Sequence, residues 1–209
     1  MGYLVRKADA FLREWKQNPD RNPLIIKGAR QVGKTETIRT FARENYKNVV
    51  EINFITEPAY KSIIDEGFST DHIIKLISRI DPTKHFVENE TLIFFDEIQD
   101  FPEIATALKF FKENAKYDVI CSGSLLGVQY QRIASISVGY KTDYQMYSMD
   151  FEEFLWAKGY SEEMVLDMLG HMLEGIAFSE AEHTILSNLF LEYCILGGMP
   201  AIVSSYIER

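Results

Sequence analysis

Residues 28–35 have the types and spacing of a loop that binds phosphate groups. Gly28 and Gly33 enclose four residues, and Lys34 and Thr35 follow them directly. Glycines let backbone N–H groups wrap closely around a phosphate, a lysine gives positive charge to the outer phosphates, and a threonine hydroxyl can bind Mg²⁺. A glycine-rich turn with a solvated lysine is the alternative. The residues predicted to contact a nucleotide are Gly28, Ala29, Arg30, Gln31, Val32, Gly33, Lys34, Thr35 and Glu36.

Two adjacent carboxylates at the end of an apolar run form a second chemical element. Asp96 and Glu97 follow residues 91–95, which have the pattern of a buried strand, where acidic side chains need partners. Beside a phosphate loop, Asp96 would hold a water of the Mg²⁺ shell, and Glu97 would orient and deprotonate the attacking water. This pair favours hydrolysis over transfer to another acceptor. A strand that runs into a solvated acidic loop is the alternative, since Asp100 and Glu103 follow.

Two polar residues at the ends of other apolar runs complete the predicted site. Ser122 would contact the γ-phosphate or the attacking water, and Asn53 would hydrogen-bond Glu97 and hold it away from water. Serine and asparagine are also ordinary turn residues at strand ends, which is the alternative for both. The predicted catalytic residues are Lys34, Asn53, Glu97 and Ser122, and the predicted metal ligands are Thr35 and Asp96.

Short apolar runs that alternate with helical patterns must position these residues. Strands are predicted at 24–26, 49–54, 91–95, 119–121 and near 143–148. Apolar residues spaced by three and four predict helices between them, and an amphipathic helix at 8–15 begins the chain. Alternating strands and helices indicate a parallel sheet covered on both faces. The sequence therefore predicts an α/β fold of the P-loop NTPase type over residues 1–150, with a five-stranded parallel sheet and helices on both faces.

After residue 150 the pattern becomes purely helical. Two pairs have the spacing of capping boxes that begin helices, namely Asp150 with Glu153 and Ser179 with Glu182. A helix should end at Gly197-Gly198, and another should begin soon afterwards. We therefore expect a small all-helical lid or linker region over residues 151–209, which the chain does not complete.

Composition fits a globular protein. The chain has 209 residues, 46% of them hydrophobic and 25% charged, which excludes a disordered or collagen-like protein. Two cysteines cannot form a disulfide framework and no apolar leader begins the chain, so a reducing, cytoplasmic location is expected. The longest uncharged stretch, residues 193–207, is shorter than the roughly 20 apolar residues of a membrane span, so no membrane partner is expected.

Charge is distributed unevenly along the chain. Residues 1–50 carry a net charge of +6, residues 51–150 carry −7 and residues 151–209 carry −8. Solvated helix faces of differing sign explain such asymmetry most simply. A basic first third would also attract a polyanion, either nucleotide phosphates or nucleic acid.

Several strings of residues together are specific enough to indicate a family. They are Tyr3-Leu4-x-Arg6 and residues 26–35, 52–54, 95–99, 122–126, 138–139, 147–155 and 197–200. With these strings the chain resembles, over essentially its whole length, the prokaryotic family of AAA+-type ATPases in which the ATPase is followed by a C-terminal domain of unknown function. Members of that family usually carry Lys or Arg directly after Val-Gly, where this chain has Tyr140. Arg132 and Lys141 are therefore the remaining candidates for a basic finger, a positively charged residue that acts on the nucleotide of a neighbouring subunit.

The resemblance implies an AAA+ core that binds ATP and Mg²⁺. It assigns phosphate and Mg²⁺ binding to Lys34 and Thr35, the hydrolytic pair to Asp96 and Glu97, and a sensing role to Ser122. It also implies that the chain is the N-terminal part of a longer protein with a winged-helix and nuclease-like C-terminal module. An effector domain in cis, a homo-oligomer, or nucleic acid bound through that module are the implied partners.

Three functions are compatible with these observations. The first is an ATPase. The pattern N/T-K-x-D that gives specificity for guanine is absent, since residues 83–86 come nearest to it and do not match. The second is a nucleotide-gated switch with negligible turnover, suggested by Asn53, Tyr140 and the few basic residues after 150. The third is a DNA-binding module that uses the basic first third.

Overall fold

The computed structural model describes residues 2–124 and 139–208, and the chain divides into two compact units. The sheet unit comprises Leu12–Arg30 and Lys34–Met146. The helical unit comprises Met1–Phe11, Gln31–Gly33 and Tyr147–Arg209. Three residues of the predicted phosphate loop therefore group with the helices. The division at residue 150 expected from the sequence stays a prediction.

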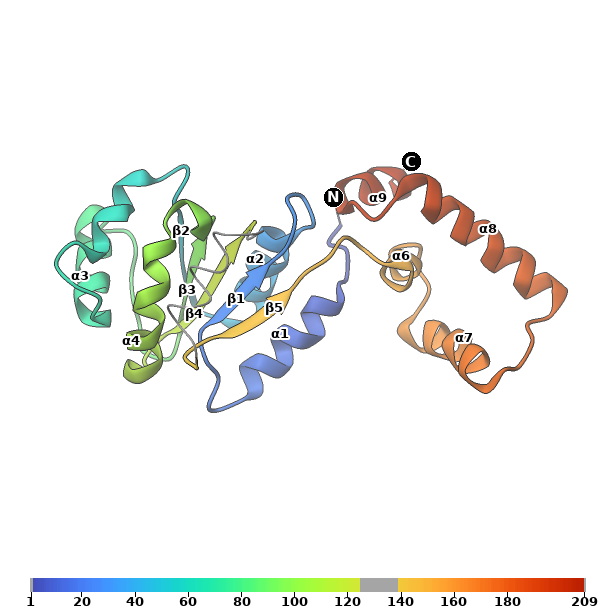
Figure 1. Ribbon diagram of the computed structural model, residues 1–209, viewed down its shortest axis with the longest axis horizontal. Coiled ribbons are helices and arrows are strands. Elements are labelled where there is room, and N and C mark those ends of the chain that lie inside the picture. Colours follow the sequence, from blue (N-terminus) through green and yellow to red (C-terminus); the bar gives the residue numbers. More distant parts are fainter. Residues whose placement is uncertain (1, 125–138, 209) are drawn as a thin grey trace. The chain divides into compact units, whose positions relative to one another are not determined.

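In the described part of the sheet unit, five parallel strands form one sheet in the order β2-β3-β4-β1-β5 (Figure 1). This confirms the predicted α/β fold class. The fifth strand ends three residues earlier than the pattern near 143–148 predicts. The strands are β1 (Leu24–Lys27), β2 (Asn48–Asn53), β3 (Thr91–Asp96), β4 (Asp118–Gly123) and β5 (Thr142–Gln145).

Helices cover the sheet because each has a row of apolar residues at helical spacing. Ile73 and Ile77 of one helix and Phe111 of another are buried in a common core with alternate residues of β3, such as Phe95. The strand residues between them are buried as well, as expected for a parallel sheet covered on both faces. The helices of this unit are the second half of α1 (Lys7–Gln17), α2 (Lys34–Asn45), α3 (Thr70–Ile80) and α4 (Ala107–Asn114), with shorter turns η1 (Pro58–Ile64), η2 (Ile98–Asp100) and η3 (Pro102–Thr106).

The register of the strands places their polar ends at one edge of the sheet. Asn53 at the end of β2 pairs with Asp96 at the end of β3. Ser122 near the end of β4 pairs with Ile26, one residue before the end of β1. All four strands point the same way, so the loop after β1 begins at the edge where these side chains lie.

The helical unit contains α6 (Phe151–Ala157), α7 (Glu162–Glu174), α8 (Glu180–Leu196) and α9 (Pro200–Ile207). Both predicted capping boxes are present, one before α6 and one before α8. The predicted helix end is also confirmed, because α8 ends directly before Gly197, whose φ is +71°. A side chain at Gly198 would meet the carbonyl oxygen of Met149 at 2.1 Å, which explains the glycine there.

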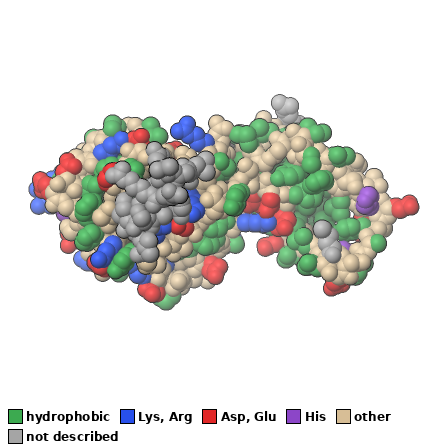
Figure 2. All heavy atoms as spheres, viewed as in Figure 1, with side chains coloured by type: hydrophobic (Ala, Val, Ile, Leu, Met, Phe, Trp, Pro, Cys, Tyr) green, Lys and Arg blue, Asp and Glu red, His purple; other side chains and the backbone are tan. Residues whose placement is uncertain are grey.

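The core of the helical unit is small. Phe154 and Val203 are buried with Met149, while Leu173 is 88% exposed and Ile195 is 83% exposed. Figure 2 shows hydrophobic side chains on the surface of this unit. Within the described residues, no helix has both the length and the apolarity needed to cross a bilayer.

Candidate nucleotide-binding site

Lys34 lies at the first position of α2, where the loop after β1 ends. Its ammonium group donates hydrogen bonds to the backbone oxygens of Gly28 at 3.0 Å and Ala29 at 2.7 Å. Burial lowers the pKa of Lys34 from its ordinary value, and the nearby carboxylates of Glu97 and Asp96 oppose that shift. The lysine is thus folded over the loop, with its charge beside the acid pair.

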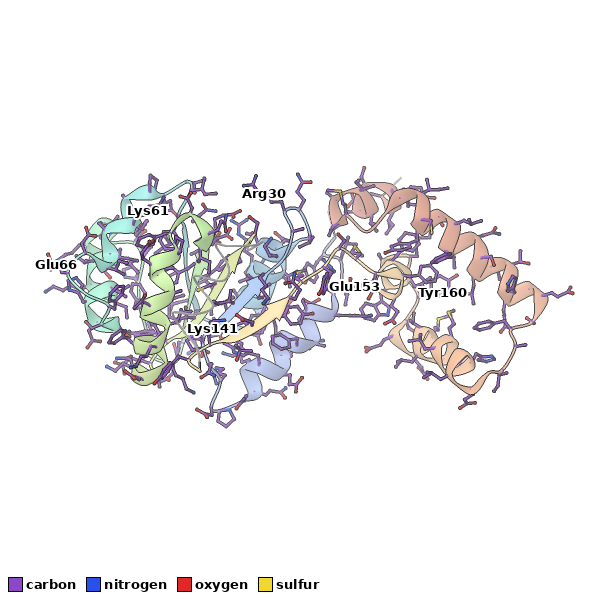
Figure 3. All side chains as sticks on the ribbon, in the orientation of Figure 1. Arg30, Lys61, Glu66, Lys141, Glu153 and Tyr160 are labelled. Carbon is purple, nitrogen blue, oxygen red and sulfur yellow. The ribbon has the colours of Figure 1, made fainter. Side chains whose placement is uncertain are left out.

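The loop itself has an unusual backbone at two positions. Gly33 has a φ of +97°, which glycine adopts at no steric cost, and Gln31 has a φ of +65°. The left-handed conformation costs a residue with a side chain about 1–2 kcal/mol. Val32 between them is buried, and Arg30 is exposed (Figure 3).

Asp96 collects hydrogen bonds from several elements of the sheet unit. The hydroxyl of Thr35 and the amide of Asn53 each donate to its Oδ2 at 3.2 Å, and the hydroxyl of Ser122 donates to its Oδ1. Asp96 as a whole residue is 4% exposed. Burial raises the pKa of Asp96 from its ordinary value, while the hydrogen bond from Ser122 acts in the opposite direction. The structure therefore brings three other predicted site residues, Thr35, Asn53 and Ser122, together around the Asp96 carboxylate.

The expected hydrogen bond between Asn53 and Glu97 is not what the structure shows. The Asn53 amide donates to Asp96, its register partner, and its Oδ1 accepts the N–H groups of Ile55 and Thr56 in the turn after β2. Glu97 lies one residue beyond β3 with a φ of +57°, which turns the chain away from the strand direction. Asn53 thus stabilises the turn after β2, which was the alternative to a catalytic role, and its amide also orients Asp96.

Gln99 is the residue that bonds the Glu97 carboxylate. Its Nε2 donates to Glu97 Oε2, and its Oε1 accepts the N–H of Ser124 at 3.1 Å. The side chain of Gln99 therefore connects the acid after β3 with the end of β4. Sequence reasoning missed this residue, although an amide two positions after a candidate base was a signal that could have found it.

Two other predicted residues have different surroundings. Glu36 lies in the first turn of α2, and its carboxylate pairs with Arg43 at 3.4 Å on the exposed side of that helix. Lys141, a candidate basic finger, forms an ion pair with Asp143 at 2.6 Å. The other candidate, Arg132, lies outside the described residues.

Residues 20–155 match the protein family described as AAA domain. The chain belongs to the AAA domain family. The matched range includes the loop at 28–35, the acid pair, and Asn53 and Ser122, which bond Asp96 from two neighbouring strands. A comparison of the chain with curated proteins found no match.

Two solved structures resemble this AAA domain at low identity. The structure of PCH-2 from C. elegans has 10% identity and a TM-score of 0.43, covering 83% of this chain and 47% of that one. The structure of Drosophila ORC bound to DNA has 12% identity and a TM-score of 0.42, covering 67% of this chain and 89% of that one. The chain thus spans about half the length of the PCH-2 chain.

The donor atoms of the site fit Mg²⁺ better than a transition metal. The Thr35 hydroxyl and the Asp96 carboxylate are hard oxygen donors whose oxygens lie 3.2 Å apart. In the part of the chain that the structure describes, no group of three or more His, Cys, Asp or Glu residues could hold a metal ion. Mg²⁺ commonly uses one or two protein oxygens and takes its other ligands from phosphates and water. The residues of this AAA domain therefore fit that ion.

Proposed function

We propose that this AAA domain binds ATP with Mg²⁺ and hydrolyses it with a water molecule activated by Glu97. The hydrogen bond from the Thr35 hydroxyl to the Asp96 carboxylate carries the proposal. It joins residues 61 positions apart, one at the end of the loop and one at the end of β3. Membership of the AAA domain family supports nucleotide binding at this loop.

Phosphate binding would use Lys34 and the start of α2. The ammonium group of Lys34 now bonds the backbone oxygens of Gly28 and Ala29, and phosphate oxygens would replace these neutral acceptors with charged ones. The helix N-terminus adds unpaired N–H groups and a favourable dipole for an anion. The loop residues 28–33 would contribute their own N–H groups.

Thr35 and Asp96 would hold Mg²⁺, which would neutralise part of the phosphate charge when bound. Asn53 and Ser122 would orient the Asp96 carboxylate, because each donates a hydrogen bond to it. Ser122 lies at the end of β4 and would also respond to the terminal phosphate.

Glu97 would accept a proton from the attacking water at a carboxylate oxygen. The side-chain amide of Gln99 would hold that carboxylate in place, through the bond that the structure shows. The left-handed backbone at Glu97 supports a functional assignment, since such strain in a residue with a side chain persists where the surroundings impose it.

Replacement of Thr35 by valine is expected to weaken the dependence of ATP affinity on Mg²⁺. Valine keeps the shape and loses the hydroxyl, so the gain in affinity on adding Mg²⁺ should fall at least about tenfold. Isothermal titration with ATP in Mg²⁺ and in EDTA measures this gain. Thr40→Val is the matched control, because the Thr40 hydroxyl interacts with Arg43 farther along α2. Equal Mg²⁺ gains for Thr35→Val and Thr40→Val would refute the assignment.

Steady-state phosphate release from Mg²⁺–ATP tests whether this AAA domain turns nucleotide over. The competing function is a nucleotide-gated switch with negligible turnover, in which the bond from Gln99 would instead keep the Glu97 carboxylate from the attacking water. Release that stays at the uncatalysed rate, with and without DNA, would support the switch. Rapid release by the chain alone would eliminate it.

A role in binding nucleic acid directly has less support from the structure. Several basic side chains of the first third form ion pairs within the sheet unit, among them Arg21 with Asp118 at 2.7 Å and Arg39 with Glu51 at 2.6 Å. We propose instead that nucleotide state acts on an attached effector module or on a second subunit. A salt titration of DNA affinity would distinguish the two, since direct binding through phosphates weakens steeply with salt.

A further inference from the structure

A buried arginine outside the site just described contacts the phosphate loop. Arg6 lies directly before α1, in the helical unit, and is 4% exposed. Its Nη1 donates to the backbone oxygen of Val32 at 2.7 Å, and its Nη2 donates to that of Tyr147 at 2.8 Å. Its Nε lies 3.1 Å from Oε1 of Glu153. One guanidinium thus joins the loop, the segment before α6 and α6 itself.

Glu153, the acidic partner, is fixed by contacts of its own. It lies in the first turn of α6, is 4% exposed and accepts the backbone N–H of Lys7 at 2.7 Å (Figure 3). Its other carboxylate oxygen accepts the N–H of Asp150 at 3.2 Å in the capping box. A buried ion pair loses its hydration, so it stabilises a fold less than apolar packing in the same place would. A contribution to folding stability alone therefore does not explain why Arg6 and Glu153 are paired here. A movement of Arg6 would therefore displace Glu153 and disturb the capping box at the start of α6.

The bond to Val32 acts on a peptide group that can contact phosphate. The oxygen of Val32 and the N–H of Gly33 belong to the same peptide unit. A positive charge bonded to a peptide oxygen polarises the unit and makes its N–H a stronger donor. Arg6 would thus strengthen the Gly33 donor without touching the nucleotide.

The backbone on either side of Val32 also needs support. Gln31 and Gly33 both have positive φ values, +65° and +97°. Strained loop conformations persist where the surroundings over-determine them. The buried Val32 side chain and the bond from Arg6 fix the residue between these two positions.

We propose that Arg6 is a positioning residue that fixes the phosphate loop and couples nucleotide binding to the start of α6 through Glu153. The coupling rests on the proposed function, because ATP is the ligand that the loop is expected to bind. Arg6 bonds the loop and Glu153 at the same time. By linkage, if ATP binds more tightly to the loop conformation that Arg6 holds, then bound ATP also stabilises the contact between Arg6 and Glu153. ATP should therefore reduce the opening of the first turn of α6.

Lys7 provides a matched control for Arg6. Its ammonium group pairs with Asp150 at 2.5 Å and Glu152 at 2.9 Å, so it also holds the start of α6. Lys7→Gln removes a positive charge from the same helix end and leaves the bond from Arg6 to Val32 in place. Arg6→Lys keeps a positive charge for Glu153, but a single ammonium group cannot make the three contacts of a planar guanidinium.

The experiment measures Mg²⁺–ATP affinity and amide hydrogen exchange at residues 151–157 in the full chain. For the wild-type chain we expect ATP binding and slower exchange when ATP is bound. Arg6→Lys should raise the Kd about 10- to 100-fold and abolish the ATP-dependent slowing even at saturating ATP. Lys7→Gln should change the Kd less than about threefold and keep the slowing.

Glu153→Gln tests the coupling to α6 separately from the fixing of the loop by Arg6. It also takes the place of Arg6→Lys if Arg6→Lys does not fold. It keeps the bond from Arg6 to the loop, so ATP should still bind, while exchange at residues 151–157 should no longer respond. Wild-type affinity and an unchanged response in Arg6→Lys, or an unchanged response in Glu153→Gln, would overturn the coupling. A wild-type chain that binds no ATP would instead overturn the proposed function.

Discussion

Replacement of Lys34 by alanine is expected to raise the Kd for Mg²⁺–ATP at least about 30-fold. Removing one partner of a desolvated charge pair costs about 2 kcal/mol or more, which corresponds to that factor. Lys34 is the basic residue that bonds the loop carbonyls of Gly28 and Ala29, and burial already depresses its pKa. Its charge should therefore gain a strong partner when phosphate binds. Isothermal titration with ATP measures the effect.

Lys47→Ala is the control for the general loss of a positive charge. Lys47 pairs with Glu90 at 2.6 Å, and its side chain is 76% exposed. This variant should bind ATP within about twofold of the wild-type chain. Circular dichroism would verify that both variants are folded. If folded Lys34→Ala bound ATP as tightly as Lys47→Ala, the loop would not be the phosphate site.

Replacement of Glu97 by glutamine is expected to leave ATP binding intact and to lower the hydrolysis rate by about 10²- to 10⁴-fold. That range is the usual contribution of a positioned general base. Glutamine preserves size and polarity but cannot accept the proton of the attacking water. The contacts of Lys34, Thr35 and Asp96 stay in place, which is why affinity should not fall. Steady-state phosphate release and ATP titration measure the two quantities.

Asp100→Asn is the matched control for Glu97→Gln. Asp100 belongs to the same acidic segment after β3, and its carboxylate pairs with Lys61. Its loss should change the hydrolysis rate less than about threefold. Wild-type turnover by Glu97→Gln would show that the base was assigned to the wrong residue.

Local sequence patterns predicted the elements of this fold well. Each predicted strand overlaps an observed one, because an apolar run such as residues 91–95 is typical of a strand that is buried on both faces of a parallel sheet. The capping boxes at Asp150 and Ser179 were predicted for a similar reason, since their partners lie three residues away. The fifth strand was less well bounded, because its alternating pattern continues to Met146 and Ser148 beyond the paired residues.

Contacts between neighbouring strands and between distant segments could not be predicted from the sequence. The spacing places Asn53 and the acid pair at strand ends, but only the pairing of β2 with β3 shows that Asn53 meets Asp96. Gln99 reaches Glu97 because Glu97 has a left-handed backbone, which no pattern indicated. Arg6 occurred in a family-like string with no assigned role, and its contacts with Val32 and Glu153 depend on tertiary packing.

A single-turnover experiment tests the central claim most directly. Wild-type chain in excess over labelled Mg²⁺–ATP is mixed in H₂¹⁸O and quenched over time, and bound nucleotide and phosphate are analysed. The account predicts that bound ATP becomes ADP, with one ¹⁸O in each phosphate, and that Glu97→Gln binds ATP but retains it unhydrolysed. Conversion at equal rates in both chains, or no ATP bound by the wild-type chain, would contradict it.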